Sequence, residues 1–406
     1  MQDTSDIAAA TPPDAASTPP VSAPTALALA LGAASAPLGV SPDAPESLLE
    51  ELGGARSFPV FSAVSQSAVS PSVVSQELDA LVEGVGVFDL GYRGQIAVGS
   101  ADRLRWLNGM LTNNIQGLAE GAGNYSFVLN AQGRIQGDCD TFRLPDHLLV
   151  LTDRSQVPAL MAHFDRFIIM DDVALEDISA TRTALGLAGP LAAQLLAALG
   201  VSLPTAAAPP LATPDALWLM QTRICGVSVQ LTGGYPAASP RFELWCASES
   251  VRTLWDVLLA AGAVPCGVRA AEALRVLEGT PRYGVDLTER DLPQETSQAR
   301  ALHFTKGCYL GQEIVERIRS RGQVHRRLAQ FTLPSEPTAL PVELTAAGET
   351  AVAGRITSTA LYHGRRYGLG IVRTEAVERH PALDYPGGSA TLVPHPPLAR
   401  NAAQPS

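Results

Sequence analysis

Eight consecutive residues stand out in this chain, and they read Lys306-Gly307-Cys308-Tyr309-Leu310-Gly311-Gln312-Glu313. Lys306 is the only lysine among the 29 basic residues, and all the others are arginines. A compact ammonium on a flexible stem serves purposes that a planar guanidinium does not. We therefore infer that position 306 requires a lysine. The alternative is that one lysine persists by chance in an arginine-biased composition.

The thiol of Cys308 follows this lysine by two residues. The sequence predicts a short helix that begins near Tyr309 and runs through Ile318, so Cys308 would lie just before the helix start. Unpaired backbone N–H groups at a helix start and a nearby ammonium both favour a thiolate. We expect Cys308 and Lys306 to be functional. A buried cysteine at an ordinary turn is the alternative interpretation.

The residues after the cysteine extend this candidate site. Gln312 and Glu313 supply hydrogen-bond acceptors, and Tyr309 supplies an aromatic face and a hydroxyl. Gly307 and Gly311 allow turn geometry and a close approach of ligand to backbone. We expect Tyr309, Gln312 and Glu313 to contact a ligand.

The length and charge of the chain limit the classes of function. A chain of 406 residues predicts two or three domains. Most of the net charge of -11 comes from residues 1–92, which hold eleven acidic residues and one basic residue, Arg56. The rest is close to neutral and lacks the broad basic surface that binds nucleic acid. The arginines between 317 and 327 leave a local nucleic-acid site as a minor alternative.

The five cysteines indicate a reducing compartment. Their number is odd and no pair has Cys-x-x-Cys spacing, which argues against a disulfide framework and a structural zinc site. Free thiols are typical of a cytoplasmic protein, and we expect no metal. The apolar stretch 25–34 is too short to span a membrane, and no positive region precedes it as in a signal peptide.

Composition and periodicity divide the chain into a tail and a folded body. Residues 1–75 are rich in Ala, Pro and Ser, and we expect them to be mostly disordered. Apolar patterns then predict strands near 86–90, 94–98, 125–129, 133–137, 140–144, 149–152, 217–223, 227–231 and 241–246. They predict helices near 100–107, 157–169, 248–260 and 270–278, and a strand leading into a helix at 185–198.

The last part of the chain alternates strand-like runs with glycine turns. These runs lie near 328–333, 350–357, 368–373 and 390–393. Short, evenly spaced strands of this kind predict a small β-barrel or sandwich.

The stretch His303–Glu313 resembles the signature of the YgfZ family of folate-binding proteins, which are relatives of the glycine-cleavage T-protein, an aminomethyltransferase. The T-protein usually has Lys-x-Asp-Phe-x-Gly at this place, so Cys308 and the Gln-Glu pair distinguish the two branches. Further segments are similar to these families over about residues 76–395, and they are 86–117, 279–286, 292–295, 354–358 and 368–373.

The resemblance implies an α+β fold in which three domains form a ring around a folate pocket, with a small C-terminal β-barrel and a disordered tail in front. The implied ranges are 1–75 for the tail, 76–180 with 264–323 for the first domain, 181–263 for the second, and 324–398 for the barrel.

The resemblance also implies residues that hold tetrahydrofolate or a derivative of it. Asp138 matches the T-protein aspartate that handles the proton on the reacting folate nitrogen, with Asp140 as a register-shifted alternative. Tyr125 matches an aromatic residue against the ligand, and Glu243 a glutamate that pairs with the N–H groups of the pterin. An arginine contact of the T-protein is absent before Leu274, and the resemblance leaves Arg269 as the residue to compensate for it.

Two functions are implied. The first is a cytoplasmic folate-binding accessory protein that supports the assembly or repair of iron–sulfur proteins, with Cys308 as its key group. Its partners would be folate and iron–sulfur proteins or assembly factors, without a membrane. The second is a tetrahydrofolate-dependent aminomethyl- or methyltransferase.

Overall fold

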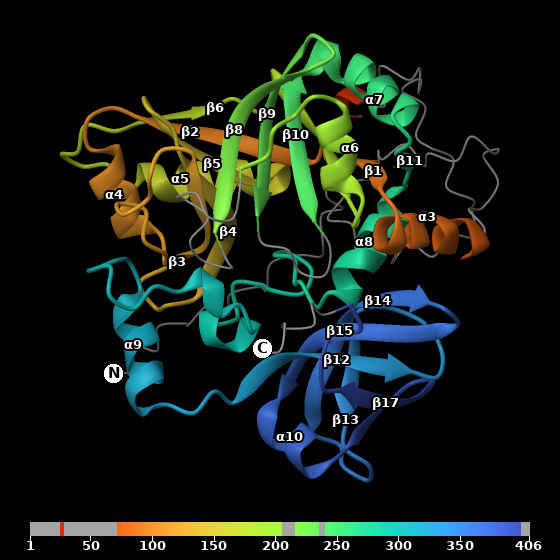
Figure 1. The fold of residues 1–406 in the computed structure, drawn as a ribbon. Coiled ribbons are helices and arrows are strands. Elements are labelled where there is room, and N and C mark those ends of the chain that lie inside the picture. Colours follow the sequence, from red (N-terminus) through yellow and green to blue (C-terminus); the bar gives the residue numbers. More distant parts are fainter. Residues whose placement is uncertain (1–24, 28–70, 205–215, 235–239, 399–406) are drawn as a thin grey trace, which may run out of the picture.

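The computed structural model describes residues 25–27, 71–204, 216–234 and 240–398. Strands in these residues form one sheet of eleven strands and one closed barrel of six strands. The strand order is β11-β1-β7-β10-β9-β8-β3-β4-β5-β2-β6 in the sheet and β12-β15-β14-β13-β16-β17 in the barrel. Figure 1 shows the barrel below the large sheet, with helix α8 above strand β14.

The first half of the large sheet carries two helices on one face. Its strands are β2 (Arg93–Gly99), β3 (Ala122–Leu129), β4 (Ile135–Arg143), β5 (Leu148–Asp153) and β6 (Ala174–Asp177). The helices are α4 (Arg103–Met110) and α5 (Val157–Asp165), and a single 3₁₀ turn, η1 (Arg154–Gln156), leads into α5. Apolar residues of α4 and α5, such as Leu107 and Phe164, bury one face of β2, β4 and β5.

The second half repeats this arrangement. Its elements are β1 (Gly86–Asp89), which lies between β11 and β7, then β7 (Arg182–Ala188), α6 (Ala192–Ala198), β8 (Leu217–Ile224), β9 (Val227–Gly234), β10 (Arg241–Ala247), η2 (Ser248–Ser250), α7 (Val251–Ala260) and β11 (Val264–Pro265). Leu196 of α6 and Leu254 of α7 pack with Leu187 and Leu244 in a second core.

The remaining elements connect the sheet to the barrel. They are α3 (Pro71–Glu83), α8 (Val268–Leu277), η3 (Pro293–Thr296), η4 (Ala299–Ala301) and α9 (Gln312–Arg321). The barrel contains β12 (Arg326–Leu333), β13 (Val342–Thr345), β14 (Val352–Tyr362), β15 (Arg365–Arg373), α10 (Thr374–Arg379), β16 (Ala382–Tyr385) and β17 (Gly388–Val393).

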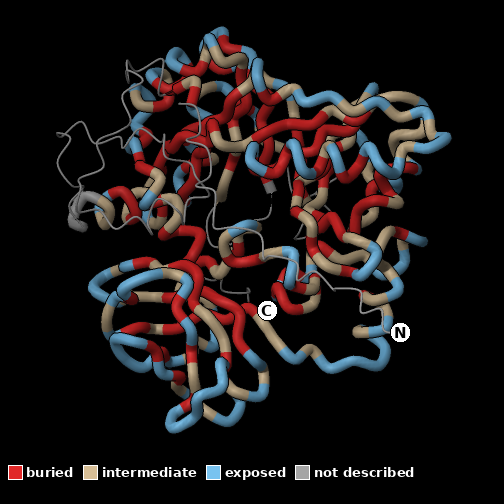
Figure 2. Tube along the Cα trace, turned by 180° about the vertical axis from the view of Figure 1, so that it is seen from behind, coloured by how far each residue is buried: buried red, intermediate tan, exposed pale blue. Residues whose placement is uncertain are grey.

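The inner faces of both sheet halves share one core with α8 and the barrel. Phe127 and Trp245 of the sheet, Leu274 of α8 and Leu369 of the barrel belong to this single cluster. Figure 2 shows buried segments running through the sheet and into the barrel. The helices on the outer faces leave this inner side free to hold a cavity.

The β-barrel predicted for the C-terminal region is confirmed, because β12–β17 close into a barrel. Two of its strands, β13 and β16, were not predicted, since each has only four residues. The two strands predicted at 133–137 and 140–144 are one continuous strand, β4. The ranges predicted for the domains stay a prediction.

Two helix starts differ from the prediction. Ser100 has a left-handed backbone with φ 73°, and helix α4 begins only at Arg103. Gly311 is left-handed with φ 81°, so α9 begins at Gln312 rather than near Tyr309. Cys308 therefore lies four residues before the helix and not at its start.

The disorder predicted for residues 1–75 lies mostly outside the described residues. Within that range, Thr25–Leu27 packs against the body with Leu27 fully buried, and helix α3 begins at Pro71. No helix among the described residues is long and apolar enough to cross a membrane.

Candidate functional site

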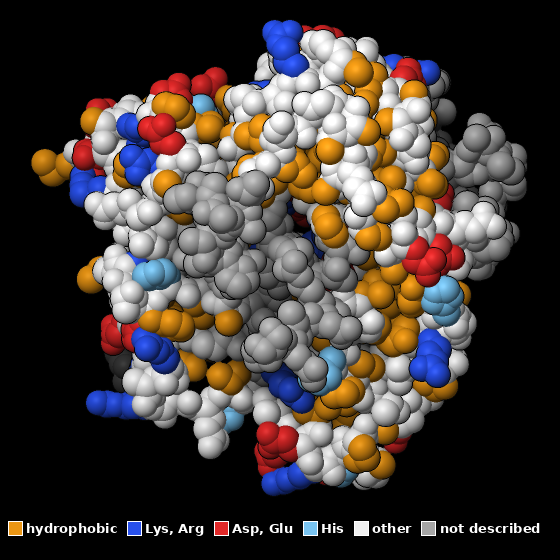
Figure 3. Space-filling model, in the orientation of Figure 1, with side chains coloured by type: hydrophobic (Ala, Val, Ile, Leu, Met, Phe, Trp, Pro, Cys, Tyr) orange, Lys and Arg blue, Asp and Glu red, His pale blue; other side chains and the backbone are white. Residues whose placement is uncertain are grey.

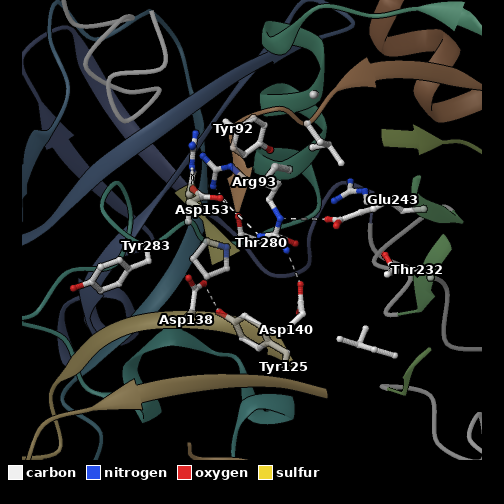
Figure 4. Close-up of a pocket in the computed structure, with 18 of the residues that line it drawn as sticks. Tyr92, Arg93, Tyr125, Asp138, Asp140, Asp153, Thr232, Glu243, Thr280 and Tyr283 are labelled. Carbon is white, nitrogen blue, oxygen red and sulfur yellow. Dashed lines mark hydrogen bonds and ion pairs between the residues drawn. The ribbon is translucent and has the colours of Figure 1, made fainter. Parts of the chain in front are cut away.

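A cavity of about 230 Å³ lies on the inner side of the large sheet. Its lining comes from β1–β5, β8–β10, α8 and the segment 280–300, and Figure 4 shows many of these side chains pointing toward one another. A hollow on the face drawn in Figure 3 also shows basic side-chain atoms at its bottom. The charged and tyrosine residues of the lining are Tyr92, Arg93, Tyr125, Asp138, Asp140, Asp153, Arg241, Glu243, Glu272, Arg275, Arg282, Tyr283 and Arg300.

Strand alternation brings three of the predicted residues to this cavity. Asp138 and Asp140 are two positions apart on β4 and therefore point to the same face, while Cys139 between them is buried in the opposite core. Tyr125 of β3 stands directly opposite Asp140 in the antiparallel register. Both registers considered for the aspartate thus lead into the cavity.

The carboxylate of Asp138 is held by two neutral donors. The hydroxyl of Tyr125 donates to one oxygen at 2.7 Å, and the amide of Gln156 donates to the other at 3.0 Å. Burial raises the pKa of Asp138, and the two hydrogen bonds act against that rise. A carboxylate with a raised pKa and a fixed orientation can accept or orient a proton at neutral pH.

The ring of Tyr125 is covered on one face. The guanidinium carbon of Arg300 lies 4.3 Å from the ring centroid, a cation–π distance. Burial and the neighbouring Asp138 raise the pKa of the Tyr125 hydroxyl well above its usual value, so it stays a hydrogen-bond donor. Tyr125 therefore contributes a hydroxyl to Asp138 and a ring to Arg300.

Arg93 lies among three carboxylates. Its guanidinium is 2.9 Å from Asp140, 3.8 Å from Asp153 and 3.5 Å from Glu243. Burial alone would lower the pKa of Arg93, but these carboxylates raise it, so the group stays charged. Its Nε atom is buried and has no hydrogen-bond partner within the described residues.

Glu243 is oriented by a tryptophan. The indole N–H of the buried Trp245 donates to one carboxylate oxygen at 2.9 Å, and the other oxygen faces Nε of Arg93 at 3.5 Å. Within the described part of the chain this second oxygen makes no shorter contact with a donor, so it can accept a hydrogen bond from a ligand. Strand β10 thus presents Glu243 to the cavity from the side opposite to β4.

A network of ion pairs supports the wall of the cavity that α8 and the segment 280–300 form. Arg282 pairs with Asp153 at 2.9 Å and with Glu272 at 3.5 Å, and Arg275 pairs with Glu272 at 2.9 Å. Arg275 also donates to the buried Asp286 at 2.6 Å. These arginines neutralise the acidic groups and are held in place by them.

Asp286 connects this wall to the barrel. One of its oxygens accepts hydrogen bonds from the hydroxyls of Thr357 at 2.6 Å and Ser358 at 2.7 Å. The register of β14 shifts between Ile356 and Ser358, which is the signature of a bulge. A bulge re-aims side chains, so two consecutive residues of one strand reach the same carboxylate.

The motif at 303–313 lies outside the cavity lining. The ammonium of Lys306 donates to the backbone oxygens of Asn108, Leu111 (2.6 Å) and Asn113 (2.6 Å) at the end of α4. Burial lowers the pKa of Lys306 to about 7. The lysine thus anchors its loop to α4, while Cys308 is exposed on that loop.

The other predicted ligand contacts also lie away from the lining. Tyr309 is 7% exposed and packs in the main core, and its backbone N–H donates to the side chain of Gln312 at 3.2 Å. Glu313 and Arg269 are exposed. Of the predicted site residues, the cavity brings together Tyr125, Asp138 and Glu243, with Asp140 beside them.

The sequence interpretation missed most of the residues around these three. Gln156, Trp245 and Arg300 lie on separate elements and carry no local motif. Arg93 and Arg282 could have been found, because they belong to the stretches 86–117 and 279–286, whose similarity to the T-protein family was apparent.

Comparisons with known proteins agree with this architecture. The sequence model of the GCVT N-terminal domain family matches residues 51–306, which is more than half of the chain. An aminomethyltransferase of Rubrobacter xylanophilus is 28% identical over 306 residues, which cover 74% of this chain and 80% of that protein. A putative chloroplastic transferase of Arabidopsis thaliana is 26% identical over 328 residues, covering 77% of this chain and 71% of that protein.

A solved structure shows the same fold. The chain matches the crystal structure of the glycine cleavage system aminomethyltransferase T from Bartonella henselae with a TM-score of 0.69 and 20% identity. The match covers 87% of this chain and 96% of that one. The fold is therefore T-protein-like, with mixed helices and strands and a C-terminal barrel.

Proposed function

The chain belongs to the GCVT N-terminal domain family, and from this premise we propose that its cavity binds tetrahydrofolate or a derivative of it. The observation that carries the proposal is the pair of carboxylates on opposite walls. Asp138 is held by Tyr125 and Gln156 on one side, and Glu243 is held by Trp245 on the other.

The residues around the cavity fit a reduced pterin. Its ring presents N–H donors, which suit the available oxygen of Glu243. It also carries a secondary amine nitrogen, whose proton Asp138 can accept or orient. When bound, tetrahydrofolate would supply a nitrogen nucleophile for a one-carbon unit. About 230 Å³ is below the usual range of ~300–1,000 Å³ for drug-sized ligands, so we assign the ring to the cavity and the glutamate tail to its mouth.

Glu243→Gln tests this assignment. The amide replaces one acceptor oxygen by a donor, and we expect affinity for 5-formyltetrahydrofolate, measured by titration calorimetry, to fall about tenfold or more. Glu249→Gln is the matched control, because Glu249 is an exposed glutamate just after the same strand. Equal affinity of both variants and the wild type would exclude Glu243 as a ligand contact.

Within the family, we propose the YgfZ-like role of a cytoplasmic accessory protein for iron–sulfur cluster assembly or repair. The support is the signature at 303–313 together with the position of Cys308, which is exposed and outside the cavity lining. A thiol in this position is available to a partner protein while a folate occupies the cavity. The five cysteines are all free, which suits a reducing compartment.

Complementation tests the role of the thiol. In cells that lack this protein, we expect the activity of an iron–sulfur enzyme to fall and to be restored by wild type and by Cys225→Ser, but not by Cys308→Ser. Cys225 is the matched control because it is the other exposed cysteine. Rescue by Cys308→Ser would refute a thiol role.

The second candidate function is a tetrahydrofolate-dependent aminomethyltransferase. It is favoured by the names of the relatives and by the buried Asp138, which has the orientation that a proton-transfer group needs. Release of ammonia and methylenetetrahydrofolate from a lipoyl-linked aminomethyl group would establish it. Absence of turnover with intact folate binding would leave the accessory role.

A further inference from the structure

A short N-terminal segment, Thr25–Leu27, lies against the folded body. This segment is outside residues 51–306, the range that the family model matches. Leu27 is fully buried and Thr25 is 6% exposed. Leu27 belongs to the same apolar cluster as Val87 of β1 and Leu187 of β7. The segment is therefore part of the core on the helix-covered side of the second half-sheet.

Asp89 and Gly91 form the surface on which the segment lies, and both fit Thr25 closely. The hydroxyl of Thr25 donates to one carboxylate oxygen of Asp89, and the other oxygen accepts the backbone N–H of Gly91 at 2.8 Å. Asp89 is only 6% exposed, and a buried carboxylate needs such donors. A Cβ atom on Gly91 would lie 2.6 Å from Cβ of Thr25, so the segment fits only because a glycine stands there.

The same stretch of chain also forms the cavity wall. Strand β1 ends at Asp89, and the chain then turns at Gly91 and Tyr92, where the N–H of Arg93 donates to the backbone oxygen of Leu90 at 2.8 Å. The neighbours of Asp89 and Gly91 in this stretch line the cavity, and they are Phe88, Leu90, Tyr92 and Arg93. The segment and the cavity thus contact different residues of a single six-residue stretch, 88–93.

We propose that Thr25–Leu27 is an intramolecular latch and that Asp89, Gly91 and the apolar cluster around Leu27 are its docking surface. With the latch attached, its contacts with Asp89 and Gly91 hold the stretch 88–93 in place, and Arg93 keeps its position among the carboxylates of the cavity. Release of the latch would loosen this wall and weaken ligand binding. The effect on ligand rests on the folate site proposed above, whereas the attachment itself does not.

Hydrogen exchange in the full-length chain tests the attachment. We expect Leu27→Asp to speed exchange in residues 86–94 about tenfold or more and to leave the barrel strand β12 unchanged. Leu361→Asp makes the same change at a leucine of the barrel that is 40% exposed, and it should leave exchange at 86–94 unchanged. Thr25→Val, which removes only the hydroxyl, should give a smaller increase confined to 89–91. Wild-type exchange at 86–94 in both latch variants would overturn the proposal.

The affinity for 5-formyltetrahydrofolate tests the link to the cavity. We expect it to weaken about threefold to tenfold in Leu27→Asp and not in Leu361→Asp. Faster exchange with unchanged affinity would leave a latch but refute its control of the cavity. If the wild type does not bind this probe, the proposed folate site fails, and the exchange result still decides whether the latch exists.

Discussion

At the scale of single residues, Lys306 explains why one lysine occurs in a chain that otherwise uses arginine. Its ammonium donates to three backbone oxygens that end helix α4. A tetrahedral ammonium can meet three converging acceptors, whereas a planar guanidinium directs its donors along a fixed fork. We expect Lys306→Arg to lower the free energy of unfolding by about 1–3 kcal/mol, because carbonyl groups at a helix end would lose their donor.

Urea unfolding measures this change. Arg252→Lys is a suitable control, because Arg252 is an exposed residue that pairs with Asp256 one helical turn away. Its exchange for lysine should alter stability by less than about 0.5 kcal/mol. If Lys306→Arg behaves like this control, the lone lysine is a matter of composition. If the stability does fall, Lys306 has an anchoring role. The sequence alone had suggested a different role, in which its charge activates Cys308.

Asp89 gives the molecule a pH-dependent stability. Burial raises its pKa to about 6, and the hydrogen bonds from Thr25 and Gly91 act against this rise. Between about pH 4 and 6 the folded state therefore binds the proton more tightly than the unfolded state, and the free energy of unfolding falls as pH rises through this window. The loss is complete above about pH 7.

The variant Asp89→Asn is neutral at every pH and should escape this loss. Its stability relative to wild type should rise from near zero at pH 4 to about 1–3 kcal/mol at pH 7.5. Denaturant unfolding at three pH values measures the difference, with Asp256→Asn as an exposed control. A difference that does not change with pH would show that Asp89 is equally solvated in both states.

At the scale of elements, strand β4 shows what the sequence could and could not predict. A period of two residues places Asp138 and Asp140 on one face, so the candidate site could be predicted from the pattern. The sequence, however, predicted two strands in place of β4, and the first of them ended at Gly137. A Cβ atom there would lie 2.8 Å from both Gln156 and Leu160, so this glycine permits a close approach of α5 rather than a turn. No local signal distinguishes these two uses of glycine.

The helix ends show a similar limit. The sequence predicted helices near 157–169, 248–260 and 270–278, and each exists with a start or end moved by a few residues. The ion pairs of the lining could not be predicted, because Arg93, Arg275 and Arg300 come from elements that meet only in the folded chain. Their partners are decided by the packing of the sheet against α8 and the segment 280–300, which no local pattern encodes.

At the scale of the whole molecule, the barrel and the large sheet share one apolar core. The T-protein-like fold was predicted from motifs at 86–117, 303–313 and 368–373, which lie in both parts. Leu328 and Ile371 of the barrel pack in the same core as Leu78 and Leu277 of the body. Asp286 adds a polar connection through Thr357 and Ser358.

This shared core leads to a prediction about unfolding. All four tryptophans lie before residue 256, so tryptophan fluorescence reports only on the body, and hydrogen exchange of β12 and β15 reports on the barrel. In the wild type both should be lost at the same urea concentration, as in a two-state transition. In Thr357→Val combined with Ser358→Ala, the barrel should lose protection first, because removal of each hydroxyl costs about 1 kcal/mol at the connection.

Thr359→Val is the control. It removes a hydroxyl from the residue that follows Ser358 on the same strand, and Thr359 is not among the described residues that donate to Asp286. It should leave the two transitions coincident. Coincident transitions in the double variant as well would mean that the apolar core alone couples the barrel to the body. The bulge in β14 would then serve only to satisfy Asp286, and the cavity wall that Arg275 and Arg282 form would not depend on the barrel for its position.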